Sequence, residues 1–124
     1  MANNKKSDSR ILADSIISGM QERKANNIVL VDLREVEHAM ADYFVICHGD
    51  SNTQVSALAD SVIEQTLKDI KEKPWHKEGY ENCQWVLLDY FDVVAHVFYK
   101  EDREFYNLES LWADAKLEEI DYEI

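Results

Sequence analysis

The sequence predicts an α/β or α+β fold, in which helices pack on a small mixed sheet of four to five strands. Three observations lead to this prediction. Apolar runs of strand length occur between segments whose apolar residues recur at helical spacing, no internal repeat is visible, and no Gly/Ser-rich or Pro-rich linker divides the 124 residues. A chain of this length is the usual size of one domain. We therefore expect a single domain over residues 1–124, with a core over about residues 9–115 and an acidic tail over 116–124.

The chain is expected to begin with a helix and two strands. Apolar residues at roughly helical spacing behind Asp8 and Ser9, either of which can cap a helix, predict a helix over residues 9–24. Residues 28–33 (IVLVDL) are β-branched and almost all apolar, which is typical of a strand covered on both faces and central in its sheet. Residues 43–47 (YFVIC) predict the second strand.

A longer helix is expected after the second strand. Ser51 and Gln54 fit a capping box, in which the hydroxyl accepts a backbone N–H and the amide side chain reaches back. The apolar residues that follow share one helix face as far as about Lys73, and Pro74 ends the helix because proline disfavours the α conformation of the residue before it.

The second half of the chain predicts a hairpin and a short helix. Residues 85–90 (WVLLDY) and 93–98 (VVAHVF) are apolar strands separated by so few residues that a hairpin is the simple connection. The short final helix is marked by the apolar residues Phe105, Leu108, Leu111 and Trp112.

The charge of the chain disfavours two classes of partner. Thirteen Lys and Arg against 25 Asp and Glu leave a formal charge of −12. Nonspecific binding to a phosphate backbone or an anionic membrane needs a cationic surface, so neither is expected, and no direct nucleic-acid specificity is predicted. Residues 101–124 are the most acidic part of the chain. Two interpretations of this end stay open: a solvated tail that keeps the protein soluble, or an acidic field that steers a basic protein partner.

The sequence also bears on compartment and chemistry. The first ten residues are polar, and no apolar run has the length of a signal peptide or a membrane span, so we expect a cytoplasmic protein without a membrane partner. Cys47 and Cys83 are expected to be reduced thiols. The four histidines lack metal-ligand spacing and no nucleophile-elbow sequence occurs, so no catalytic residue, metal or cofactor is predicted.

One junction nevertheless resembles an enzyme site. Gly49 and Ser51 lie between a strand and a helix, where backbone amides and the helix dipole can hold a phosphate, although Ser51 is also explained as a helix cap. This layout is similar to a nucleotidyltransferase-like fold, with Asp89 and Asp92 as the candidate carboxylates. Residual nucleotide binding or nucleotidyl transfer is therefore the alternative function. A two-residue turn would also place Asp89 diagonally beside His96, where the two could form a hydrogen-bonded pair.

Aromatic residues next to charged ones mark several loops and strand ends. They occur at residues 42–43, 75–80, 89–92 and 103–106. Trp, Tyr and Arg are enriched at interface hot spots, which favours a protein-binding surface. The alternative is that these side chains only edge the core, as Tyr and Trp often do. Self-association through the same aromatic surface is a third possibility.

Three stretches of the chain resemble one known family. They are residues 42–62 (DYFVICHGDSNTQVSALADSV), 74–98 (PWHKEGYENCQWVLLDYFDVVAHVF) and 103–115 (REFYNLESLWADA). In this order and combination they are similar to the ribosomal silencing factor family, also called the Iojap family, over about residues 9–115. Two departures are mild: Cys47 and His48 replace small or polar residues, and Ala95 replaces a common valine.

The resemblance implies a fold and a function. It implies a nucleotidyltransferase-like α/β fold and a noncatalytic translation repressor that binds the large ribosomal subunit through universal ribosomal protein fourteen. Occupying that place blocks joining of the small subunit and lowers translation when nutrients are scarce. A homodimer would be compatible with this activity. The docking surface expected from the matching motifs and the aromatic segments consists of Tyr43, Trp75, His76, Glu78, Gly79, Tyr80, Asp89, Tyr90, Asp92 and His96, with Arg103 and Tyr106 nearby.

Overall fold

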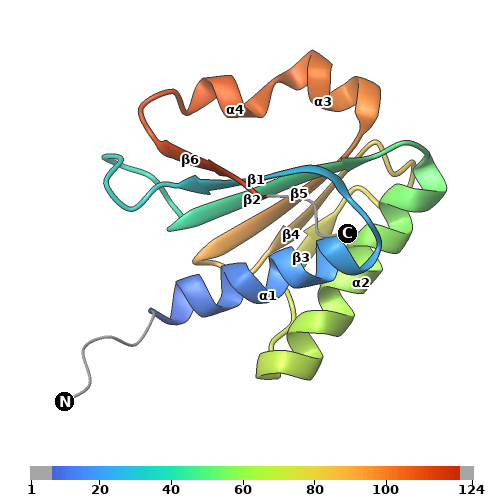
Figure 1. Ribbon diagram of the computed structural model, residues 1–124, viewed down its shortest axis with the longest axis horizontal. Coiled ribbons are helices and arrows are strands. Elements are labelled where there is room, and N and C mark those ends of the chain that lie inside the picture. Colours follow the sequence, from blue (N-terminus) through green and yellow to red (C-terminus); the bar gives the residue numbers. More distant parts are fainter. Residues whose placement is uncertain (1–6, 121–124) are drawn as a thin grey trace.

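The computed structural model describes residues 7–120, which form a mixed sheet with helices on both faces (Figure 1). The elements in chain order are α1 (Asp8–Glu22), β1 (Asn26–Asp32), β2 (Tyr43–Gly49), α2 (Asn52–Ile70), β3 (His76–Glu78), β4 (Trp85–Asp89), β5 (Val93–Tyr99), α3 (Lys100–Tyr106), α4 (Leu108–Leu111) and β6 (Lys116–Glu119). This order confirms the predicted mixed α and β class.

The sheet has six strands in the order β3-β4-β5-β2-β1-β6. β2 and β5 are parallel, and the other neighbouring pairs of described strands are antiparallel. The predicted count of four to five strands is therefore too low. The two strands missed are the edges, β3 and β6, whose residues are all exposed. Short charged edge strands carry no alternating apolar pattern, since their charge protects the sheet edge from further pairing.

The first part of the predicted acidic tail is a strand. A tail was expected from residue 116, but Lys116–Glu119 pair antiparallel with β1. Leu117 lies opposite Val31, and the Ile120 N–H donates to the carbonyl of Ile28 at 2.9 Å. The backbone of these residues thus completes the sheet while their carboxylates stay exposed. The remainder of the predicted tail, residues 121–124, lies outside the described residues.

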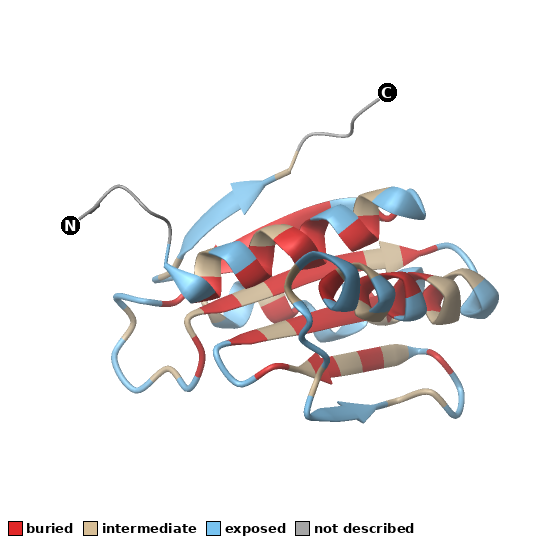
Figure 2. Ribbon diagram, turned by 90° about the horizontal axis from the view of Figure 1, so that it is seen from below, coloured by how far each residue is buried: buried red, intermediate tan, exposed pale blue. Residues whose placement is uncertain are grey.

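Two helical layers enclose the sheet unequally. Figure 1 shows α1 and α2 on one face, and α3 and α4 on the opposite face. Seen from the side of α1 and α2, both helices alternate buried and exposed positions along their length (Figure 2). Their buried residues, such as Ile16 and Leu58, pack against Val45 and Val97 of the central strands. A smaller cluster on the other face joins Val31, Ile46, Phe98 and Leu108.

The helix ends follow the predicted chemistry. Ser51 Oγ accepts the Gln54 N–H at 3.1 Å, and Gln54 Oε1 accepts the Asp50 N–H at 2.8 Å, so the predicted capping arrangement is confirmed. α2 ends at Ile70, three residues before the predicted position, because Lys71 turns into the left-handed conformation with φ 59°. The predicted final helix is two short helices, since Asn107 has φ 47° and separates α3 from α4.

The two long helices approach most closely at Gly19. A Cβ atom there would lie 2.7 Å from Val62 Cα and 3.0 Å from the carbonyl oxygen of Ser61. Ser61 Oγ donates to the Gly19 carbonyl at 2.8 Å, which ties the helices together at this point. The backbone of α2 therefore leaves no space for a side chain at this position of α1.

We expect Gly19→Ala to lower the free energy of unfolding by about 1–2 kcal/mol. Overpacking a core contact costs about 1–3 kcal/mol, and a contact with backbone lies in the upper part of this range, so the cost outweighs the gain of about 1 kcal/mol from replacing glycine in a helix. Urea denaturation measures the change, with Ser18→Ala on the exposed side of α1 as control. A Gly19→Ala protein as stable as the unmodified chain would show that the two helices are not in close contact.

Candidate functional site

Among residues 7–120, no helix lies above about half of one sheet face. α3 and α4 pack over β1, β2 and β5 and leave β3 and the hairpin end of β4 uncovered in the described part of the chain. Strand pairing puts the side chains of β3, β4 and β5 in register on this face. The open sheet face, as we call it, consists of His76, Glu78, Leu87, Asp89 and Val94. Its apolar members are half-buried, and both residues from β3 are exposed.

Two exposed aromatic rings stand at one end of the open sheet face. The rings of Trp75 and Phe91 are stacked, with centroids 4.5 Å apart and planes at 10°. Trp75 is 59% exposed and Phe91 is 63% exposed. The backbone N–H of Trp75 donates to the Asp89 carbonyl at 3.0 Å, and Asp89 Oδ1 accepts the backbone N–H of Phe91 at 2.8 Å. We refer to Trp75 and Phe91 as the ring pair, and Asp89 attaches both to the end of β4.

The hairpin turn places one of these rings at a conformational cost. The Tyr90 N–H donates to the Val93 carbonyl at 2.9 Å, which closes the turn and confirms the predicted hairpin. Phe91 has φ 75°, in the left-handed region that bulky residues rarely adopt. Such strain costs about 1–3 kcal/mol and persists only where the surroundings enforce it. Here the turn keeps a large apolar ring in solvent.

An aromatic cluster of Trp85, His96, Phe98 and Tyr106 lies beside the open sheet face. Trp85 stacks on Phe98 at 4.8 Å and contacts the Tyr106 ring at 4.9 Å, and its indole N–H donates to His96 Nδ1 at 3.1 Å. His96 is 4% exposed, and its Nε2 has no partner among the described residues. Because Nδ1 accepts a hydrogen bond, the proton of the neutral ring is on Nε2. Burial lowers the pKa of His96 to about 3, so the ring is uncharged at neutral pH.

The predicted pair of Asp89 and His96 does not form. The strand register does place them diagonally on one face, as expected. Each is engaged elsewhere, since Asp89 Oδ1 accepts the Phe91 N–H and His96 Nδ1 accepts the Trp85 N–H. The expectation of a hydrogen bond between them is wrong, since Nε2 of His96 is buried and has no partner among the described residues.

The structure gathers about half of the twelve predicted docking residues around the open sheet face. His76, Glu78 and Asp89 belong to it, Trp75 is in the ring pair, Asp92 is exposed beside Phe91, and Tyr106 lies next to Trp85. His76 Nε2 and Glu78 Oε2 are 2.6 Å apart.

The other predicted residues lie below the surface or towards the other face. Tyr43 is 1% exposed and Tyr90 is buried under the helices, where its hydroxyl is 2.9 Å from Thr66 Oγ1 and desolvation raises its pKa to about 12. Tyr80 packs against the same helix-side core, and its hydroxyl donates to Asp60 Oδ1 at 3.1 Å. Gly79 has φ 97°, and a Cβ there would collide with the Trp85 carbonyl.

Sequence reasoning missed three residues of the candidate site. Leu87 and Val94 of the open sheet face and Phe91 of the ring pair were not among the predicted docking residues. Leu87 belongs to a run of apolar residues in which only the register shows which side chains face away from the helices. Phe91 lies between Tyr90 and Asp92, which are both predicted docking residues, but its outward direction depends on the left-handed turn.

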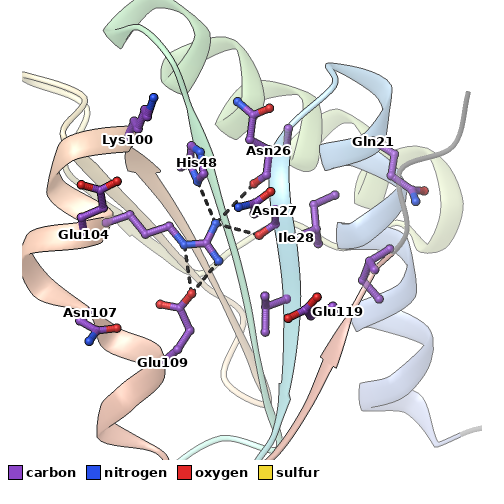
Figure 3. Close-up of a pocket in the computed structure, with 14 residues that line it drawn as sticks. Gln21, Asn26, Asn27, Ile28, His48, Lys100, Glu104, Asn107, Glu109 and Glu119 are labelled. Carbon is purple, nitrogen blue, oxygen red and sulfur yellow. Dashed lines mark hydrogen bonds and ion pairs between the residues drawn. The ribbon is translucent and has the colours of Figure 1, made fainter.

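Arg103 of α3 lies on the half of this sheet face that the helices cover. Its buried guanidinium is the centre of a group of hydrogen bonds that we call the Arg103 clamp. Its Nη1 donates to the carbonyl of Asn27 at 2.7 Å and is 2.9 Å from His48 Nδ1, and its Nε and Nη2 donate to Glu109 Oε2 at 3.0 and 2.6 Å. Figure 3 shows Asn26, Asn27, His48 and Glu109 around this guanidinium. Burial and the nearby positive charge of Arg103 lower the pKa of His48.

A cavity of about 770 Å³ lies beside the clamp and contains both acidic and basic side chains. All three guanidinium nitrogens of Arg103 donate to protein acceptors. The same hydrogen bonds join α3 and α4 to β1 and β2. We therefore assign the Arg103 clamp a structural role rather than a ligand-binding one.

The candidate nucleotide site is not assembled. Gly49 ends β2, whereas the Asp92 carbonyl accepts the Asp42 N–H at 2.7 Å at the start of the same strand. Seven residues of extended chain span about 20 Å, so Gly49 and Ser51 lie at the opposite end of the sheet from Asp89 and Asp92. The prediction of a single nucleotide site built from these four residues is therefore wrong. Within residues 7–120, no group of three or more His, Cys, Asp or Glu side chains is arranged to hold a metal ion. The helices of this region include none with the length and apolarity to span a bilayer.

Comparison with known proteins identifies the family. The family described as "Ribosomal silencing factor during starvation" matches residues 6–124. Ribosomal silencing factor RsfS of Bacillus subtilis is 42% identical over 102 residues, which cover 82% of this chain and 84% of that protein. The mouse protein named "Mitochondrial assembly of ribosomal large subunit protein 1" is 30% identical over 80% of this chain and 44% of its own length. A crystal structure of a Chromobacterium violaceum protein superposes with a TM-score of 0.80 at 28% identity, covering 95% of this chain and 94% of that one. The chain belongs to the ribosomal silencing factor family.

Proposed function

We propose that this protein is a noncatalytic repressor of translation that binds the large ribosomal subunit through universal ribosomal protein fourteen and blocks joining of the small subunit. Membership of the ribosomal silencing factor family supports a regulatory role on the ribosome. The name of the mouse relative, which refers to assembly of the large ribosomal subunit, supports the choice of subunit.

The observation that carries the proposal is the open sheet face with the ring pair at its end. Stable interfaces have apolar and aromatic centres with polar rims. Leu87 and Val94 supply half-buried apolar area, Trp75 and Phe91 supply exposed rings, and Glu78 and Asp89 supply negative charge. An acidic surface attracts a basic protein, whereas ribosomal RNA phosphates repel it. The docking surface is therefore suited to a ribosomal protein rather than to RNA.

The predicted residues divide into two roles in this proposal. Those that contact the partner are Trp75, His76, Glu78, Asp89, Asp92 and Tyr106, together with Phe91 and Leu87. Those that hold the face in shape are Tyr43, Gly79, Tyr80, Tyr90, His96 and Arg103. This division follows from exposure, since a buried side chain such as Tyr43 or Tyr90 offers no surface to a partner.

We expect Trp75→Ala to weaken binding to large ribosomal subunits by about 2 kcal/mol, which is about 30-fold in Kd. In this proposal the exposed indole becomes buried on docking, and alanine removes that aromatic contact. Leu67→Ala on α2 is the matched control, because Leu67 is also exposed but lies on the opposite layer. A folded Trp75→Ala protein with unchanged Kd would remove Trp75 from the interface.

Co-sedimentation tests the proposed function as a whole. The full chain is mixed with isolated large subunits, isolated small subunits and joined ribosomes at low and moderate salt. We expect binding to free large subunits alone, and reduced joining when small subunits are added afterwards. Light scattering of the free protein at several concentrations detects self-association through the same face. Absence of binding to large subunits would overturn the proposal.

A further inference from the structure

We propose that the ring pair and the carboxylates of Asp89 and Asp92 bind an arginine side chain of the docked partner. This inference rests on the proposed docking function, and it specifies the chemistry recognised at one end of the open sheet face. The partner's guanidinium would lie flat on an outer face of the Trp75–Phe91 stack. Its N–H groups would donate to the neighbouring carboxylates.

The geometry of the ring pair suits a planar cation. Trp75 and Phe91 are nearly parallel, so each ring uses one face for the other and leaves its second face outward. Both rings are mostly exposed. The Trp75 ring centroid lies 5.8 Å from that of His76, so the stack adjoins the open sheet face, to which His76 belongs. A guanidinium is planar and stacks on aromatic faces, and tryptophan is the aromatic residue that attracts cations most strongly.

The charges around the stack favour a positive ligand. Asp89 Oδ1 accepts the Phe91 N–H, and Oδ2 of the same carboxylate accepts no hydrogen bond from the described residues. Asp92 follows Phe91 and is exposed. The nearby Lys77 is directed elsewhere, since its ammonium lies 5.3 Å from the Tyr80 ring centre. With a formal charge of −12 on the whole chain, a cationic side chain is attracted both locally and at long range.

Arginine fits this arrangement better than lysine or an apolar side chain. Its donors form a rigid fork that can reach a carboxylate while the plane stays on a ring. Lysine offers a compact, strongly hydrated charge that cannot stack as a plane. An apolar side chain would bury the rings but would leave the carboxylates desolvated without a donor.

Fluorinated tryptophans at position 75 provide the test. The full chain is made with tryptophan carrying one, two or four ring fluorines at this codon, and its Kd for isolated large ribosomal subunits is measured. Fluorine keeps the ring apolar and planar but withdraws the negative charge of its face. We expect the Kd to rise step by step, to about tenfold with four fluorines. The same Kd throughout the series would overturn the cation-binding inference.

Charge variants and the partner's own residues complete the test. We expect Asp92→Asn to weaken binding several-fold, while Glu64→Gln on the exposed side of α2 loses the same charge without effect. Purified universal ribosomal protein fourteen is then the second probe, with its arginines replaced one at a time by lysine. One replacement should weaken binding to the unmodified chain but not to the tetrafluorinated chain. If none of the arginine replacements has this effect, the inference is overturned. If the unmodified chain fails to bind large subunits, the proposed function itself is overturned.

Discussion

Replacing Arg103 with alanine is expected to lower the free energy of unfolding by about 3–5 kcal/mol. The guanidinium is buried and donates to the Asn27 carbonyl and to Glu109 Oε2, and it lies against His48 Nδ1. Alanine would leave these acceptors without their shared donor, and the partly buried Glu109 carboxylate would lose its ion-pair partner. The cost of such unpaired groups exceeds the modest net gain of an exposed ion pair.

Urea denaturation of the full chain measures this loss, and Arg34→Ala is the matched control. Arg34 also forms a close ion pair, with Asp32 at 2.8 Å, but it is exposed to solvent. We expect the control to cost far less, because solvent screens an exposed ion pair. If Arg103→Ala were as mild as Arg34→Ala, α3 and α4 would be held by apolar contacts such as Leu108 alone.

The Arg103 clamp also bears on the docking surface. α3 carries Tyr106, whose ring contacts Trp85 at the margin of the open sheet face. Arg103 binds α3 to β1 and β2, three residues earlier in the same helix. Loss of the clamp is therefore expected to loosen this margin as well as to reduce stability. A residue of a docking motif can thus matter for binding without touching the partner.

Secondary structure was predictable where local physics decides it. The capping box at Ser51 and the apolar run of β1 each depend on neighbours in the chain, and both are confirmed. The edge strand β6 depends on a distant partner, since Leu117 pairs with Val31 and its charged neighbours show no strand pattern. The left-handed residues Lys71 and Asn107, which end helices, were not predictable from the spacing of apolar residues, because that spacing carries no signal for a backbone conformation that Gly usually adopts.

The candidate site was predictable as a set of residue types but not as a surface. Motif and composition selected Trp75 and Asp89, which the structure places next to each other. They also selected Tyr43 and Tyr90, because a tyrosine beside a charged residue has the same sequence signature whether it faces a partner or a helix. Only the register and the position of α1 and α2 separate these cases, since a shift of one residue turns a strand's side chains to the other face.

The stability of the chain should depend on His96 in acid. The pKa of His96 is about 3 in the folded protein because of burial, whereas an unfolded histidine has a pKa of about 6.5. Between these values the unfolded chain binds a proton that the folded chain does not. Stability therefore rises with pH in this window, and it is lost as the pH falls below 6.5. Each pH unit changes the free energy of unfolding by up to about 1.4 kcal/mol.

His96→Gln isolates this contribution. The amide oxygen of glutamine can still accept the Trp85 N–H, but the side chain does not titrate. Between pH 7 and pH 4 we expect the unmodified chain to lose about 3 kcal/mol more than His96→Gln, measured by urea denaturation at each pH. His48 remains in both proteins, so its own lowered pKa cancels in the comparison. Parallel pH curves would mean that His96 is accessible to water and can be charged within the fold. In that case the aromatic cluster beside the open sheet face would be hydrated, and an apolar docking surface there would no longer be supported.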